Sequence, residues 1–349
     1  MEDTEELISQ THDADPEVRG RAAVKLGAVR SQESFGALVD LLGDQDNRVR
    51  VAAVRSLGDL GDNNAVEPLL PLLEEQSVEI RCTVMAALAQ IGDERAFAPI
   101  ATRLFDVDDD IRTNAAAAIG KLRDKRAFEP LMMCLDDSVE WVRANSAWSL
   151  GLIGCPDALD RLRDLADSHD TPNVRANAVS AIGMLGLDSD GAEAESALEF
   201  VLDVLGDESE EPKVRVAAAL VFGQSFSIAC GKNPEVASAA FSILYSLASK
   251  CDDPDLQSTA IWCLGKICTP ENVSKLGISH EIIDGVFDLL CASLESGYEW
   301  NVRYAIEALS DLGEERCLKA IEEFSSTDGA APYENLCDQA VMKLRGMLG

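Results

Sequence analysis

The stretch DNRVRVAAVRSLGDLGD, residues 46–62, decides the fold of this chain. Its apolar residues recur at steps of four, four and three, and so trace one face of a helix: Val49, Ala53, Leu57 and Leu60. The same steps appear after Asp15-Pro16, where an N-cap aspartate and a proline at the first helical position mark a helix start. Gly61-Asp62 ends the helix, and a second apolar stretch opens at Ala65. We therefore predict a helical hairpin.

An aliphatic residue followed by arginine recurs along the whole sequence and opens each Ala-rich helix. The pairs are Val18-Arg19, Val49-Arg50, Ile80-Arg81, Ile111-Arg112, Val142-Arg143, Val174-Arg175, Val214-Arg215 and Val302-Arg303, with Leu256-Gln257 and Leu336-Cys337 as degenerate members. Successive members are separated by 31, 31, 31, 31, 32, 40, 42, 46 and 34 residues. Four identical intervals in a row indicate an internal repeat, which changes the prediction of the whole fold.

A hairpin of this length cannot bury its apolar face alone, so neighbouring hairpins must stack. We predict an all-α fold, an α-solenoid superhelix of about nine to ten helical hairpins, capped by a short opening helix and a closing helix. The interval lengths divide one continuous solenoid into two parts, residues 1–175 with regular repeats and residues 176–349 with longer ones.

The repeating pattern Asp-x-x-Val-Arg-x-x-Ala-Ala-x-x-Leu-Gly-x-[Leu/Ile]-Gly-Asp resembles the HEAT-like repeats named after phycobilisome lyases. The resemblance implies that the aspartate and arginine of each unit bond within or between repeats. It also implies that the Val-Arg helices line the concave face. The recurring arginines are accordingly interpreted as structural residues rather than as anion-binding ones.

Extra residues follow the Val-Arg helix in the three long intervals. They are residues 186–191, 230–234 and 268–280. Because each follows the same helix of its hairpin, we expect the three additions to lie along one edge, where they form a candidate contact surface. Drift toward longer armadillo-like units, without functional meaning, is the equally weighted alternative.

Charge and composition exclude several functions. The formal net charge is −32, from 62 acidic and 30 basic residues, which argues against nucleic acid and favours a protein partner with a basic surface. Salt adaptation or a well-solvated exterior explains the same acidity. The opening residues lack the basic region and apolar core of a signal peptide, and no apolar run is long enough to span a bilayer. We expect a cytoplasmic protein without membrane insertion, whose ten cysteines are buried, reduced thiols.

Helical geometry predicts which residues of the Val-Arg helices point away from the core, namely those two, three, six and seven positions after the aliphatic residue. Two sets stand out. The candidate partner-binding residues on the concave face are Asn114, Asn145, Trp148, Asn177, Trp262 and Tyr304. The candidate residues for binding an acidic segment are Arg21, Lys25 and Arg55. Tryptophan is over-represented at binding hot spots, although filling space between helices is an equally weighted role for Trp148 and Trp262.

Catalytic residues are not indicated, and no cofactor or metal is expected. The chain has three histidines, and the one His-Glu pair, His280-Glu281, falls short of the several pairs that iron-binding deoxyhypusine hydroxylases carry on this architecture. The leading hypothesis is a non-enzymatic scaffold or assembly factor that binds a protein partner. The alternative, which the repeat resemblance implies, is a subunit of a phycobilin (tetrapyrrole) lyase or another protein-modifying complex.

Overall fold

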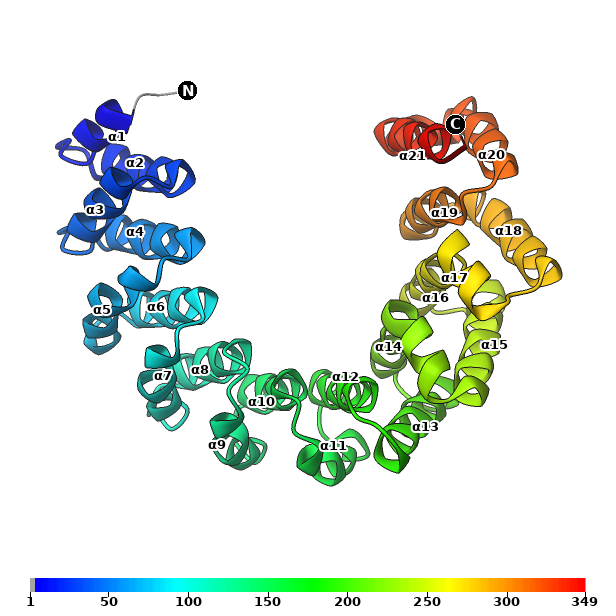
Figure 1. Cartoon of the computed structure of the whole chain (residues 1–349), viewed down its shortest axis with the longest axis horizontal. Helices are drawn as coiled ribbons and strands as arrows, with labels where there is room; N and C mark the ends of the chain where they lie inside the picture. Colours follow the sequence, from blue (N-terminus) through cyan, green and yellow to red (C-terminus); the bar gives the residue numbers. More distant parts are fainter. Residues whose placement is uncertain (1–3, 349) are drawn as a thin grey trace. The chain divides into compact units, whose positions relative to one another are not determined.

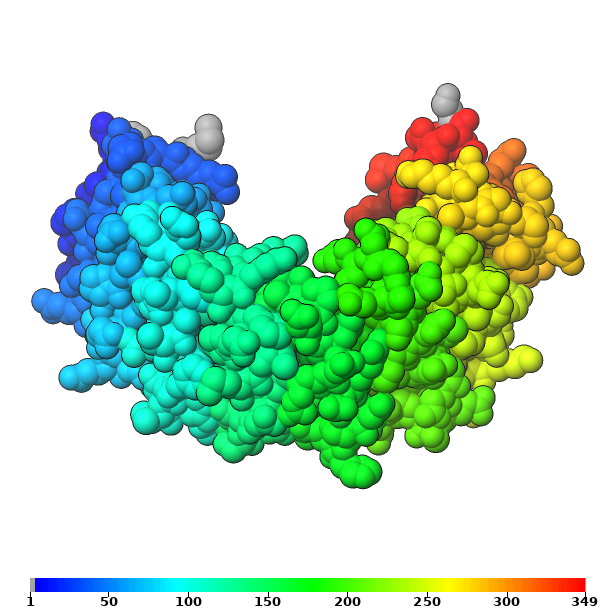
Figure 2. Space-filling view, turned by 60° about the horizontal axis from the view of Figure 1, so that its bottom comes forward, coloured from blue at the N-terminus to red at the C-terminus, as the bar shows by residue number. Residues whose placement is uncertain are grey.

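A computed structural model describes residues 4–348, and within this range the chain consists of helices, turns and loops without a β-strand. It divides into two compact units, one ending at Ala158 and the other beginning at Leu159. In each unit the helices form two rows (Figure 1). Successive repeats appear as adjoining bands in the space-filling view (Figure 2), which confirms the α-solenoid. The repeat-length boundary predicted at residue 175 stays a prediction.

Unit 1 stacks its Val-Arg helices in one row, the inner row of the curve of this unit in Figure 1. The inner helices are α2 (Pro16–Val29), α4 (Asn47–Leu60), α6 (Val78–Ile91), α8 (Asp109–Lys121) and α10 (Glu140–Ile153). The second row contains α1 (Thr4–Gln10), α3 (Gln32–Leu41), α5 (Val66–Leu69) with the 3-10 turn Leu70–Glu74, α7 (Phe97–Arg103) and α9 (Phe128–Cys134).

Unit 2 repeats this arrangement with longer helices. Its inner row is α12 (Pro172–Asp188), α14 (Pro212–Lys232), α16 (Pro254–Ile267), α19 (Glu299–Leu312) and α21 (Glu334–Leu348). The second row is α11 (Leu159–Ala166), α13 (Ala192–Gly206), α15 (Pro234–Lys250), α18 (His280–Leu294) and α20 (Glu315–Ser325), and α17 (Pro270–Leu276) is an addition between α16 and α18. The ten inner helices of the described residues agree with the predicted nine to ten hairpins.

Small residues let successive inner helices approach closely. A Cβ atom added to Gly223 of α14 would lie 2.9 Å from the Cβ of Cys263 on α16, and one added to Gly265 of α16 would lie 2.7 Å from the Cα of Ala308 on α19. Side chains of the same positions also bond across the gap, since Ser149 Oγ donates to the Ala116 carbonyl at 2.7 Å. The glycine of the repeat therefore sets the spacing of the stack.

The repeated arginines form a ladder along the loops that precede the inner helices. In each of the first five repeats, Nη1 donates to the carbonyl six residues earlier, as from Arg50 to Asp44 at 2.8 Å and from Arg143 to Asp137 at 2.7 Å. Some members also bond to an acid of the next loop, as Arg112 Nε does to Asp137 at 2.8 Å. The structural interpretation of these arginines is confirmed.

The last predicted pair, Val302-Arg303, is displaced by one residue. The N-caps Asp46 and Asp253 lie three residues before the aliphatic residues Val49 and Leu256, and the N-cap Tyr298 lies three residues before Asn301. The buried residues Ala305 and Leu309 of α19 agree, because they follow Asn301 by the usual four and eight. Asn301 thus takes the aliphatic position, and Val302 takes the position of the ladder arginine.

The three additions lie together in unit 2, as predicted. The Nζ of Lys232, in the second addition, donates to the Ser189 carbonyl and pairs with Asp190, both in the first. Cys230 and Pro234 of the second addition line one pocket with residues 275–279 of the third. Their joint edge is confirmed, whereas its role as a contact surface stays a prediction.

One helix among the described residues, α14, is long and apolar enough to span a bilayer by length and composition alone. Inside the fold, 56% of its apolar window is buried, which is what a core helix of a stacked array requires.

Candidate partner-binding surface

All nine predicted site residues lie on inner-row helices, and they fall into three columns. The first column is three residues after the aliphatic position and holds Arg21, Asn114, Asn145, Asn177 and, in the corrected register, Tyr304. The second, six residues after it, holds Arg55, Trp148 and Trp262. The third, seven residues after it, holds Lys25.

The three basic candidates, Arg21 and Lys25 on α2 and Arg55 on α4, are exposed. Arg55 lines a hollow of about 450 Å³ with Asn114, so the structure brings together two residues from the two predicted sets. Asp59 and Glu79 line the same hollow. Its surface is therefore mixed in charge, and binding of an acidic segment by the basic triplet stays a prediction.

The asparagines of α8 and α10 use their amide groups on the backbone. Asn114 Nδ2 donates to the Asp110 carbonyl of its own helix at 2.8 Å. Asn145 Nδ2 donates to the Thr113 carbonyl of α8 at 3.0 Å and so links two successive inner helices. These residues shape the surface of unit 1, while Trp148 beside them is 41% exposed and offers a large apolar face.

The unit 2 residues include two aromatic side chains that are in contact with neighbours. Trp262 is half-buried, with Lys266 Nζ at 5.7 Å from its ring centre, within the range of a cation–π contact. The rings of Tyr304 and Trp300 lie 5.7 Å apart at 34°. Asn177 Nδ2 donates to the Asn173 carbonyl at 2.8 Å, as Asn114 does in its own helix.

Trp300, at the start of α19, is not among the predicted residues. It is 47% exposed and forms, with Tyr304, an aromatic pair one helical turn apart. The spacing of four residues between two aromatics on one helix is the sequence signal that could have identified it.

Burial disfavours the thiolate form of several cysteines. All ten cysteines are free of disulfides, and burial raises the pKa of Cys134 to about 11 and that of Cys268 to about 12. The prediction of complete burial holds for five of them and is wrong for the other five, which are half-buried: Cys82, Cys155, Cys230, Cys251 and Cys291. Burial raises the pKa of Cys82 as well, to about 11, so partial exposure does not make it a thiolate.

Metal ligands do not gather on the described surface. Within residues 4–348, no group of three or more histidine, cysteine, aspartate or glutamate side chains is arranged to hold a metal ion.

A family model described as HEAT repeats matches residues 4–81, 66–147 and 137–221, which together cover more than half of the chain. A search of curated proteins found no significant match. The chain is also similar to solved α-solenoids. Because the sequence identity is low, this similarity shows a shared fold and nothing more.

A structure of the Kap95:Nup1 complex matches with a TM-score of 0.61 and 16% identity, over 98% of this chain and 51% of that one. A Kap121p mutant matches with a TM-score of 0.58 and 12% identity, over 99% of this chain and 42% of that one. This chain thus spans about half the length of these two proteins or less. The complex of CpcE and CpcF of phycocyanin lyase from Nostoc sp. PCC7120 matches with a TM-score of 0.47 and 20% identity, over 70% of this chain and 95% of that one.

Proposed function

The chain belongs to the HEAT-repeat family, and from this premise we propose that it is a non-enzymatic scaffold or assembly factor that binds a protein partner along its inner-row helices. Stacked hairpins present a long row of surface positions whose identity the core does not fix. In this chain the row carries large aromatic side chains at positions where alanine or serine suffices for the stack.

The observation that carries the proposal is the exposure of Trp148. It stands in the middle of α10, where its neighbours Ala147 and Ser149 are buried, yet 41% of its own surface is open to solvent. An exposed tryptophan buries a large area on binding at a small cost in side-chain entropy. Trp262 occupies the same column in unit 2.

The acidity of the chain supports a basic partner. With a net charge of −32, long-range attraction accelerates the encounter with a positively charged surface and repels nucleic acid. Kap95 is solved with the protein Nup1, which supports a protein rather than a small molecule as the ligand of such an array. Ten free thiols fit a reducing, cytoplasmic setting.

The test is affinity purification from the native source, followed by mass spectrometry, with variants of the inner row. Trp148→Ala and Trp262→Ala should lower recovery of the partner. Trp141→Ala is the matched control, because Trp141 also lies on α10, is 54% exposed and stands outside the three columns. Equal recovery with all three variants, each checked for native helix content, would contradict the proposed surface.

A lyase subunit is the second function to be tested. Incubation of the protein with a bilin and a client carrying the acceptor cysteine should leave the bilin absorbance unchanged if the chain is a scaffold. Covalent transfer to the client would replace the scaffold proposal with a modifying activity.

A further inference from the structure

The arginine ladder is interrupted at α19, where Val302 occupies the arginine position. In the regular repeats the arginine side chain fills the niche beside the preceding loop, and its Nη1 reaches carbonyls six or five residues earlier, as in Arg19 to Asp13 at 2.8 Å and to Ala14 at 3.1 Å. Valine is too short to reach these carbonyls. The next residue, Arg303, does not replace it, because Arg303 turns to Glu299 of its own helix at 3.6 Å and lies over the Trp300 ring.

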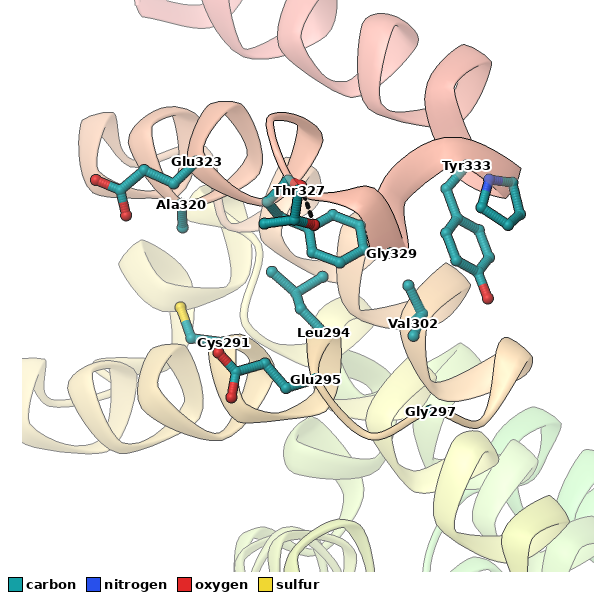
Figure 3. A pocket seen from close by; sticks show the side chains of 12 residues that line it. Cys291, Leu294, Glu295, Gly297, Val302, Ala320, Glu323, Thr327, Gly329 and Tyr333 are labelled. Carbon is teal, nitrogen blue, oxygen red and sulfur yellow. Dashed lines mark hydrogen bonds between the residues drawn. The ribbon is translucent and has the colours of Figure 1, made fainter.

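A pocket of about 610 Å³ lies at this interruption, between α18, α19 and α20. Figure 3 shows Leu294 and Val302 in the middle of the pocket, with Cys291 and Glu295 on one side and Tyr333 on the other. Gly297, which lies five residues before Val302, also lines it. This is the spacing at which the ladder arginines Arg19, Arg81 and Arg143 find a carbonyl acceptor. The pocket thus includes the position that a ladder arginine occupies in the regular repeats.

The lining carries the features that a guanidinium group needs. Two carboxylates, Glu295 and Glu323, line the pocket, and neither forms an ion pair with any residue in the range 4–348. No lysine or arginine of the described chain lines it. The rings of Phe324 and Tyr333, 6.3 Å apart, offer faces for stacking. The chain already uses such stacking, since the Arg316 guanidinium lies 4.4 Å from the Phe287 ring centre.

We propose that this pocket binds an arginine side chain from a basic segment of a protein partner. The arginine would enter as the ladder arginines do, with its stem against Leu294 and Val302 and its guanidinium near the Gly297 carbonyl. The carboxylates of Glu295 and Glu323 would supply negative charge from the other side of the pocket, where Figure 3 draws them. None of the lining residues belongs to the three columns of the inner row. The inference therefore goes beyond the proposed function and stands or falls separately from it.

The probe is a short fluorescein-labelled glycine–serine peptide with one central arginine, titrated with the full chain at low salt and followed by fluorescence anisotropy. The same peptide with citrulline, which keeps the shape and removes the charge, should bind about tenfold more weakly, as expected for the loss of a charge-assisted pair. Equal binding of the two peptides, or no binding of the arginine peptide, would overturn the proposal.

Two variants locate the binding. Val302→Arg restores an arginine to the ladder, so it should fill the niche and abolish peptide binding; Met342→Arg, at an exposed position of α21, adds the same charge elsewhere and should not. Glu295→Gln with Glu323→Gln should weaken binding about tenfold, whereas Glu315→Gln with Glu322→Gln, an equal charge change on α20, should not. Unchanged peptide binding by Val302→Arg, or by Glu295→Gln with Glu323→Gln, overturns the assignment. If Val302→Arg does not fold, the double glutamine variant alone tests it. Trp148→Ala and Trp262→Ala should bind the peptide as the wild type does.

Discussion

The close approach of α16 and α19 predicts that Gly265→Ala destabilises unit 2. A Cβ at residue 265 would lie 2.4 Å from the Cβ and 2.7 Å from the Cα of Ala308. Backbone cannot move aside by changing a rotamer, so the helices must separate, and overpacking of this kind costs about 2–3 kcal/mol. Alanine regains up to about 1 kcal/mol of helix propensity over glycine. The expected net loss in the free energy of unfolding is about 1–2 kcal/mol.

Gly231→Ala is the matched control for this prediction. Gly231 also lies near the end of an inner helix of unit 2, and a Cβ there would meet nothing within 4 Å. The same substitution should therefore stabilise the chain by up to about 1 kcal/mol. The two variants differ in sign although their sequence change is identical.

Urea unfolding followed by circular dichroism at the helix band measures both variants. The midpoint should fall for Gly265→Ala and rise for Gly231→Ala, with slopes that match the wild type. A Gly265→Ala protein that is as stable as the wild type would refute the close stacking, and with it the register that pairs residue 265 with residue 308. Adding Ala308→Gly should recover part of the loss, because it removes the nearer of the two clashing atoms.

Three further predictions concern other contacts. The Arg19 guanidinium lowers the pKa of Asp44. The stability that this pair contributes is therefore present above the unfolded pKa of about 4 and is lost as the pH falls through the lower folded pKa. Asp44→Asn should remove this loss, so the free energy of unfolding should fall less steeply at acid pH than in the wild type. Arg112→Met removes the half-buried pair with Asp137 and should cost about 2 kcal/mol in urea unfolding, whereas the exposed control Arg55→Met should change stability by less than about 0.5 kcal/mol. Lys232→Met should speed hydrogen exchange in residues 188–192 without affecting unit 1, since Lys232 joins two of the added segments; unchanged exchange there would mean that the tie contributes nothing.

Local spacing was sufficient to predict the stacked hairpins, because each repeat encodes its own cap, apolar face and glycine. The predicted columns of the inner row also follow from helical geometry alone. The added segments could be placed on one edge for the same reason, since each follows the same helix of its hairpin. What the spacing could not reveal was which surface residues are in contact with neighbours, as Asn145 is with α8.

The register of α19 shows why a local pattern can mislead. Val302-Arg303 copies the repeat signature, yet Asn301 is the residue that occupies the buried aliphatic position, 3% exposed. A polar side chain is tolerated there because Asn301 Nδ2 donates to Gln257 Oε1 of the preceding inner helix at 2.7 Å. Gln257 is itself the residue that replaces the ladder arginine in its repeat. The hydrogen bond that makes Asn301 acceptable therefore joins residues 44 apart in sequence. It cannot be recognised from the sequence of a single repeat.

These two departures account for the pocket at α18–α20. Once glutamine replaces arginine at 257, its side-chain oxygen is available to an asparagine at 301, and an asparagine at 301 places Val302 where the next arginine would stand. The niche then lacks the side chain that fills it elsewhere in the ladder, and the two glutamates that line the pocket form no ion pair within the described residues. A regular repeat makes such a site recognisable, because the filled niches of the same chain specify both the shape and the charge of the missing group. Val302→Arg tests this reasoning within the protein itself. If the niche at α19 accepts an arginine as the filled niches do, the restored arginine should raise the urea midpoint and abolish peptide binding.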